Sequence, residues 1–254
     1  MSHVRASDRP FFLRPEHLQP IAGRLQPGDI VLQRREWCLT NLGIPGYWTH
    51  AALHLGTPEA LDAHFEGLPE LEGASASAYL RARHPGTWDH FCTPDDDGHP
   101  RAVIEALRPG VVLNSFEHSN HADSMCALRV KRADRSRQLA AVDEALRHFG
   151  KPYDYNFDFA TEGAVVCSEL VYKAWRAGQQ IELEPTQANG RLLLSPNEIA
   201  IKFDRELDQP DADLDMVVFL DGLPDGSIVE RGPEDLRQSW SRPKWHILVV
   251  DPEG

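Results

Sequence analysis

The chain has 254 residues, a length typical of one elaborated domain or of one domain with a small appendage. It contains 26 Lys and Arg residues against 39 Asp and Glu residues, a formal net charge of −13. Such an acidic surface repels phosphate backbones, so we expect neither nucleic acid nor an anionic membrane as a partner. No stretch approaches the roughly 20 apolar residues that a membrane helix needs, and residues 1–20 lack the apolar core of a secretory signal. The four cysteines form no Cys-x-x-Cys pair. We therefore expect a cytoplasmic protein with reduced thiols and no cofactor.

Strand and helix patterns are mixed along the chain. Turn residues and short apolar runs predict strands at 29–33, 49–55, 102–107, 111–113, 125–130, 216–220 and 245–250. Apolar residues at helical spacing predict helices over 134–149 and 165–175, with Gly178 after the second, and Ser195-Pro196 begins another helix toward Phe203. Residues 57–101 have a different character, with many turns and one helical piece near 77–83, and we expect an insertion or surface lid there. Because strands and helices do not alternate as regular βαβ units, the sequence predicts an α+β fold.

Cys167 is a candidate nucleophile because it lies near the start of the second predicted helix. The free N–H groups and partial positive charge at a helix N-terminus stabilise a thiolate. The same N–H groups can hold the oxyanion that forms when a thiolate attacks a carbonyl carbon. A single cysteine on a helix is nevertheless more often a small buried apolar residue, so position alone leaves both interpretations open.

A nucleophilic thiol needs a base and a group that orients that base. His50 is a candidate base because it begins a predicted strand, although it is one of 12 histidines and could simply be exposed. Glu105 is a candidate orienting acid because it stands alone in the apolar run Val103–Leu107. A carboxylate within an apolar strand must face water or have a partner, and the solvent face of an edge strand is the alternative.

Four motifs in this order resemble the circularly permuted NlpC-type papain-like cysteine hydrolases, the YiiX/YebB-like group. They are G-D-I at 28–30, W-T-H-A-A-L-H-L-G at 48–56, V-I-E-A-L at 103–107 and V-V-C-S-E-L-V-Y-K-A-W at 165–175. The resemblance covers roughly residues 25–56 and 102–203. It implies a central antiparallel sheet or half-barrel with the nucleophile helix packed on it, in one domain spanning residues 1–254. Residues 57–101 would then be an insertion and residues 204–254 an extension that completes the sheet or covers an edge.

The resemblance assigns Cys167 as nucleophile, His50 as general base and acid, and Glu105 as the residue that orients the imidazole. It implies a thiol-dependent hydrolase that acts on a small peptide, amide or acyl substrate and cleaves an amide, of peptide or cell-wall-fragment type, or an ester through a thioester acyl-enzyme. The gap of 54 residues between His50 and Glu105 is long, so the acid could instead be one of three others in the insertion: Glu66, Glu70 or Glu72. Geometry and not chain order makes a triad, so the permuted order is no objection.

Tyr47, Trp48 and Ser168 are candidate substrate-binding residues because they flank His50 and Cys167 in the sequence. The two aromatic residues could equally be core residues.

Three other interpretations remain. His118, His121 and Cys126 could bind zinc, but their spacing fits no standard ligand pattern, and we expect no metal. The chain could be a non-catalytic papain-like scaffold, which would leave Cys167, His50 and Glu105 apart. It could also act on acyl lipids, which would require a broad apolar groove beside the thiol.

Overall fold

We describe a computed structural model of the chain. It covers residues 9–38, 41, 43–108, 110–154, 163–177, 181, 183, 186–188 and 191–244. Within these ranges, no helix is both long and apolar enough to cross a bilayer.

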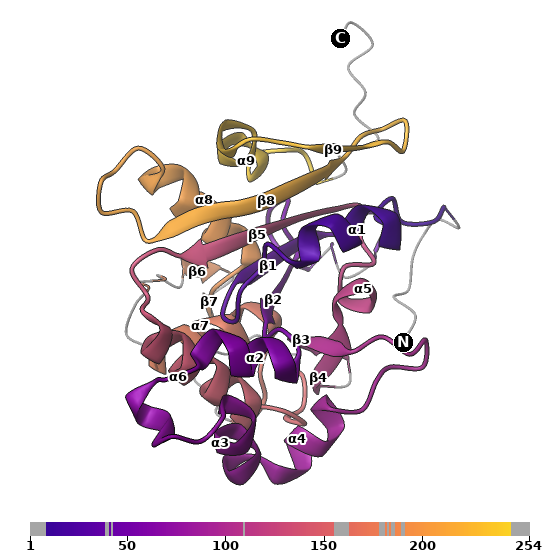
Figure 1. The fold of residues 1–254 in the computed structure, drawn as a ribbon. Helices are drawn as coiled ribbons and strands as arrows, with labels where there is room; N and C mark the ends of the chain where they lie inside the picture. The colour runs from indigo at the N-terminus through magenta and orange to yellow at the C-terminus, as the bar shows by residue number, and fades with distance from the viewer. Residues whose placement is uncertain are drawn as a thin grey trace, which may run out of the picture.

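An antiparallel sheet forms the centre of the molecule. Its strands, in chain order, are β1 (Ile30–Arg34), β2 (His50–His54), β3 (Arg101–Leu107), β4 (Gly110–Ser115), β5 (Ser124–Val130), β8 (Leu214–Gly222) and β9 (Ile228–Glu230). In the described part of the chain they lie in the order β4-β3-β2-β1-β5-β8-β9, and every neighbouring pair is antiparallel. Figure 1 shows the sheet running from β4 to β9, with helices on both sides. The α+β fold predicted from the sequence is confirmed.

The two faces of the sheet carry separate apolar clusters, because side chains alternate along each strand. On β2, Ala51 and Leu53 belong to the larger cluster, whereas Ala52 belongs to the smaller one. The larger cluster contains the buried faces of α6 (Arg135–Arg147), α7 (Cys167–Ala177) and α8 (Pro196–Glu206). The smaller cluster is covered by α1 (Pro15–Ala22) and α5 (Phe116–Ser119). His50 and Ala52 are two residues apart on one strand, so His50 faces the smaller cluster.

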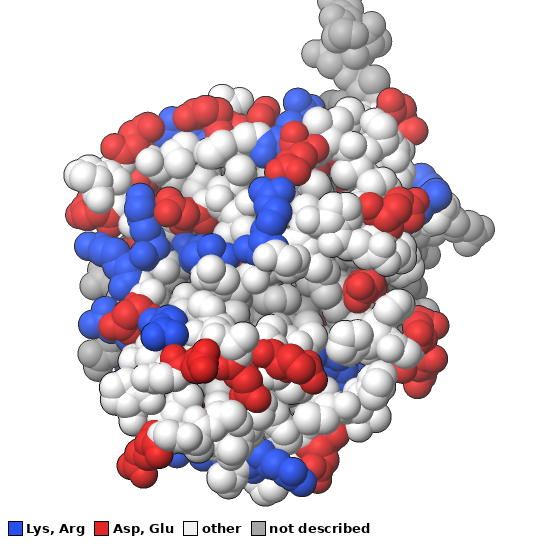
Figure 2. All heavy atoms as spheres, viewed as in Figure 1, with Lys and Arg blue, Asp and Glu red and all other residues white. Residues whose placement is uncertain are grey.

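The segment 57–101 is mainly helical. It forms α2 (Pro58–Phe65), a 3₁₀ turn η2 (Pro69–Leu71), α3 (Ala76–Arg83) and α4 (Pro85–Phe91). Only α3 was predicted. The others are short and begin at proline, a residue that also marks turns, so their helical spacing is weak. The segment packs beside α6, where Asp143 accepts hydrogen bonds from Arg83 at 2.8 Å and His84 at 2.7 Å. Acidic side chains gather on the surface over α2 (Figure 2).

The C-terminal segment extends the sheet. β8 pairs with β5, β9 pairs with β8, and α9 (Pro233–Ser239) lies beside them (Figure 1). A separate two-stranded ribbon consists of β6 (Thr186–Ala188) and β7 (Arg191–Leu193). The strand predicted at 245–250 and the helix stop predicted at Gly178 lie outside the described residues.

Candidate active site

Cys167 is the first residue of α7 and so lies at the N-terminus of the helix. The helix forms because Cys167, Leu170, Val171, Ala174 and Trp175 recur on one face, and all five are buried. The N–H groups of Ser168 and Ala51 donate hydrogen bonds to the thiol sulfur. One donor, Ser168, belongs to the α7 N-terminus, as the sequence position predicted, and the other, Ala51, belongs to β2.

His50 is the first residue of β2 and lies where β2 and β3 separate, next to the N-terminus of α7. β2 pairs with β1 from Gln33↔His50 onward, but its pairing with β3 begins only at Ala52↔Glu105. Ala51 thus lies outside the β2–β3 ladder, and its N–H is directed at Cys167. The separation of β2 from β3 at this point lets the α7 N-terminus approach His50.

Glu105 of β3 is the acid that contacts His50. Its Oε2 lies 2.6 Å from His50 Nε2, and its Oε1 accepts a 2.8 Å hydrogen bond from Asn114 Nδ2 on β4. Glu105 is fully buried and His50 nearly so. Since Nε2 faces a carboxylate it carries the proton, which leaves Nδ1 for the hydrogen bond between His50 and Cys167. The structure therefore brings together the three residues selected from the sequence.

The site favours an ionised thiol and a protonated imidazole. Burial alone would raise the pKa of Cys167, but the charge and hydrogen bond of His50 and the two backbone donors outweigh it, and the pKa is lowered. Burial would likewise lower the pKa of His50, but Cys167 and Glu105 raise it. Burial opposes ionisation of Glu105 as well, yet the His50 hydrogen bond and charge, Arg35 and Asn114 bring its pKa down to about 2. This arrangement supports a thiolate–imidazolium pair.

Two polar neighbours of the triad were missed by the sequence analysis. Asn114 fixes Glu105, and Arg35 lies close enough for its charge to act on Glu105 and Cys167. Neither residue belongs to a motif. A polar residue inside or just after a short apolar strand was the only signal, and it does not distinguish these two from exposed positions.

Asn197 of α8 was also missed, and it anchors the loop that leads into His50. Its Oδ1 accepts hydrogen bonds from the N–H groups of Tyr47 and Trp48, both at 3.1 Å, and its Nδ2 donates to Trp240 O at 3.2 Å. Gly46 has φ +85°, and a Cβ there would lie 2.2 Å from Asn197 Cγ. Only glycine therefore permits this close approach.

A narrow hollow with an enclosed volume of about 10 Å³ adjoins the thiol. Its lining is mostly apolar and consists of Gly43, Ile44, Pro45, Val166, Cys167, Ser168, Leu194, Ser195 and Pro196. Ser168 is part of this lining, and its hydroxyl donates to Leu194 O at 2.5 Å. Tyr47 and Trp48 do not line the hollow. Both are fully buried in the larger apolar cluster, so they are core residues, which the sequence left open as an alternative.

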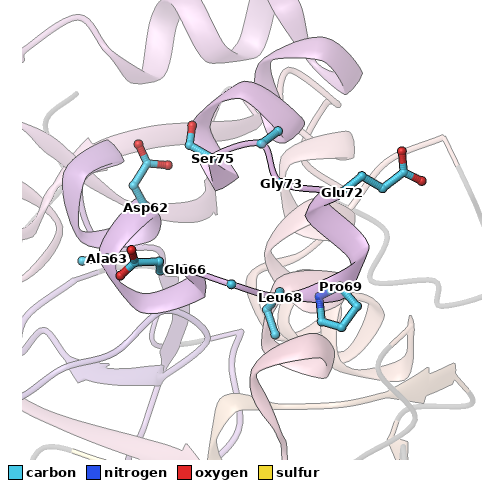
Figure 3. Close-up of a pocket in the computed structure, with 10 residues that line it drawn as sticks. Asp62, Ala63, Glu66, Leu68, Pro69, Glu72, Gly73 and Ser75 are labelled. Carbon is cyan, nitrogen blue, oxygen red and sulfur yellow. The ribbon is translucent and has the colours of Figure 1, made fainter.

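A second hollow, of about 770 Å³, lies in the segment 57–101 between α2, η2 and α3. Figure 3 shows Asp62, Glu66 and Glu72 around it, together with Ser75. No triad residue lines this hollow.

The alternative ligands and acids lie apart from the triad. Glu66, Glu70 and Glu72 are exposed, and the carboxylate that contacts His50 belongs to Glu105. The zinc candidates His118 and His121 are exposed. Their third candidate, Cys126, is buried in β5, and burial raises its pKa. Among the described residues, no group of three or more His, Cys, Asp or Glu side chains is arranged to hold a metal ion.

The chain was compared with known proteins. A search of curated proteins found no match. The crystal structure of the metalloprotein yiiX from Escherichia coli O157:H7 is similar, with 14% sequence identity, a TM-score of 0.43, and coverage of 82% of this chain and 97% of that chain. Residues 24–233 match the family model of the permuted papain-like amidase enzymes, YaeF/YiiX, C92 family. This match places the chain among thiol-dependent hydrolases at the level of class. The protein belongs to the C92 family of permuted papain-like amidases.

Proposed function

We propose that the protein is a cysteine amidase in which Cys167 is the nucleophile, His50 the general base and acid, and Glu105 the residue that orients His50. The observation that carries the proposal is the continuous chain of hydrogen bonds from the Cys167 thiol through the His50 ring to Glu105 Oε2, the last at 2.6 Å. A non-catalytic scaffold has no need for this arrangement. Burying ionised groups costs desolvation free energy, which their mutual attraction often does not recover.

The reaction begins with the Cys167 thiolate, formed by proton transfer to His50. The thiolate attacks the carbonyl carbon of an amide, and the N–H groups of Ser168 and Ala51 are placed to stabilise the oxyanion. The His50 imidazolium then gives its proton to the leaving amine, and a thioester remains on Cys167. His50 next takes a proton from water, which attacks the thioester and releases the acid.

The lining of the narrow hollow supports a limited substrate class. Ile44, Pro45, Val166, Leu194 and Pro196 favour an apolar group beside the scissile bond. The enclosed volume of about 10 Å³ holds about one water molecule, so the hollow has no room for a long lipid chain. We therefore propose an amide of a small apolar acyl or aminoacyl group as the substrate.

The test combines alkylation with a panel of chromogenic amides that differ in the acyl group. Wild-type Cys167 should react with iodoacetamide near neutral pH faster than the exposed Cys92, and small apolar amides should be hydrolysed. Cys167→Ala should abolish hydrolysis, and Cys92→Ala should leave it unchanged. A rapid quench should show the acyl group attached to Cys167 by mass spectrometry. Hydrolysis that survives in Cys167→Ala, or a Cys167 that alkylates more slowly than Cys92, would contradict the proposal.

A further inference from the structure

Arg35 is a buried cation that the proposed reaction does not use. It follows β1 directly, and only 5% of its surface is exposed. Its guanidinium donates to two backbone carbonyls at the end of α5, Nη2 to Ser119 O at 2.6 Å and Nε to His121 O at 3.2 Å. Within the described part of the chain, no carboxylate oxygen lies within 4.0 Å of it. A buried charge without a directly paired carboxylate is costly, so its presence calls for a physical reason.

Arg35 lies on the same side of the sheet as His50 and Glu105. Gln33, two residues earlier, pairs with His50 across β1 and β2. Gln33 Nε2 lies 3.2 Å from Ser119 Oγ, and Arg35 also contacts Ser119, so both side chains point toward α5. His50 and Glu105 occupy this face as well, as their 2.6 Å hydrogen bond requires.

The charged groups around Arg35 come from several elements. Burial lowers the pKa of its guanidinium, and Glu105, Cys38, Cys167 and Asp123 act in the opposite direction, with Glu105 the strongest of the four. Asp123 already has partners, since its Oδ1 pairs with Arg9 at 3.0 Å and its Oδ2 accepts from a backbone N–H at 2.7 Å.

The two residues that flank Arg35 form an ion pair with each other. Arg34 and Glu36 form a separate two-point pair, with both distances 2.9 Å. Glu105 and Cys167 are thus the ionisable groups of the triad on which the Arg35 charge acts.

The charges of the reactive state explain why a cation is needed there. An ionised Cys167, a protonated His50 and an ionised Glu105 sum to −1 in a buried site. Arg35 brings this sum to zero. In a buried site of low dielectric, a net negative charge raises the pKa of each acidic group in that site.

We propose that Arg35 is a positioning residue whose fixed positive charge balances Glu105 and thereby stabilises the Cys167 thiolate. This inference rests on the proposed function, because it assumes that Cys167 reacts as a thiolate. It assigns Arg35 no contact with substrate. A purely structural role, in which Arg35 only satisfies the carbonyls at the end of α5, is the alternative.

The test is the pH dependence of Cys167 alkylation by iodoacetamide, measured on native protein by peptide mass spectrometry. Two neutral variants, Arg35→Gln and Arg35→Met, are compared with the charged variant Arg35→Lys. Gln keeps a donor for the α5 carbonyls and Met keeps the apolar stem. The neutral variants should shift the profile upward by about one pH unit, with alkylation about tenfold slower below the midpoint. Arg35→Lys should stay close to the wild-type profile.

Each result has one meaning. A wild-type Cys167 without enhanced reactivity refutes the proposed function itself. With a reactive wild type, an unshifted profile in a folded neutral variant overturns the role of Arg35, and so does an equal shift in Arg35→Lys. Circular dichroism and the Cys92 alkylation rate report on folding. If both neutral variants fail to fold, Arg35 belongs to the fold and the proposal is also overturned.

Discussion

Replacing Glu105 by glutamine tests how strongly the acid holds the imidazolium. Gln has the shape of Glu and can still accept a hydrogen bond from His50 Nε2, so the substitution removes the charge and little else. In the wild type the pKa of Glu105 is about 2 instead of 4.5. At 1.36 kcal/mol per pH unit, this difference corresponds to about 3 kcal/mol in favour of the ionised carboxylate. The His50 hydrogen bond is the largest favourable contribution to it.

Interaction between two groups is reciprocal, so the loss of the carboxylate charge must lower the pKa of His50. Arg35 and Asn114 supply part of the roughly 3 kcal/mol that stabilises the ionised Glu105, and His50 supplies the rest. We therefore expect the titration midpoint of His50 to fall by about one to two pH units in Glu105→Gln. The amide leaving group needs the imidazolium, and hydrolysis above the new midpoint should fall about tenfold per pH unit.

The assay is a pH titration of the imidazole ¹⁵N resonances, with the His50 signals assigned by their disappearance in His50→Ala. Glu66→Gln is the matched control, since Glu66 is an exposed acid of the segment 57–101 and should leave the midpoint unchanged. A folded Glu105→Gln protein whose His50 midpoint stays within a few tenths of a pH unit of the wild type would refute the reasoning.

Three further predictions concern stability. Gly46→Ala should lower the free energy of unfolding by more than about 2 kcal/mol, because the new Cβ overlaps Asn197 and the backbone has positive φ. Urea unfolding measures this change. A decrease below about 0.5 kcal/mol would contradict the close contact. Glu36→Gln should cost about 3–5 kcal/mol because it leaves buried Arg34 without its paired charge; an unchanged urea midpoint would show that the pair is dispensable. Glu105 has a lowered pKa, so its stabilising contribution is full above pH 4.5 and is lost as the pH falls toward about 2. The free energy of unfolding of the wild type should therefore fall between pH 6 and pH 3 by more than that of Glu105→Gln. Equal decreases in the two proteins would contradict this contribution of Glu105.

Local patterns predicted much of this fold. Short apolar runs bounded by turn residues placed β1, β2, β3 and β5 to within one or two residues, and the apolar repeat at helical spacing placed α6 and α7. In both cases the signal lies within one segment of the chain. The short helices of the segment 57–101 were missed because few apolar residues repeat in seven or eight positions.

The sequence by itself determined which residues are candidates for the chemistry, namely a cysteine at a helix start, a histidine at a strand start and a lone acid in an apolar strand. The tertiary structure decided that Glu105, and none of the acids at 66, 70 or 72, contacts His50. It also decided that Tyr47 and Trp48 are core residues, that Asn114 and Arg35 act on Glu105, and that Asn197 anchors the loop before His50. These contacts join elements far apart in the chain, where strand register and helix approach set the distances. No local period records such pairings, so they are fixed only when the sheet and its helices pack together.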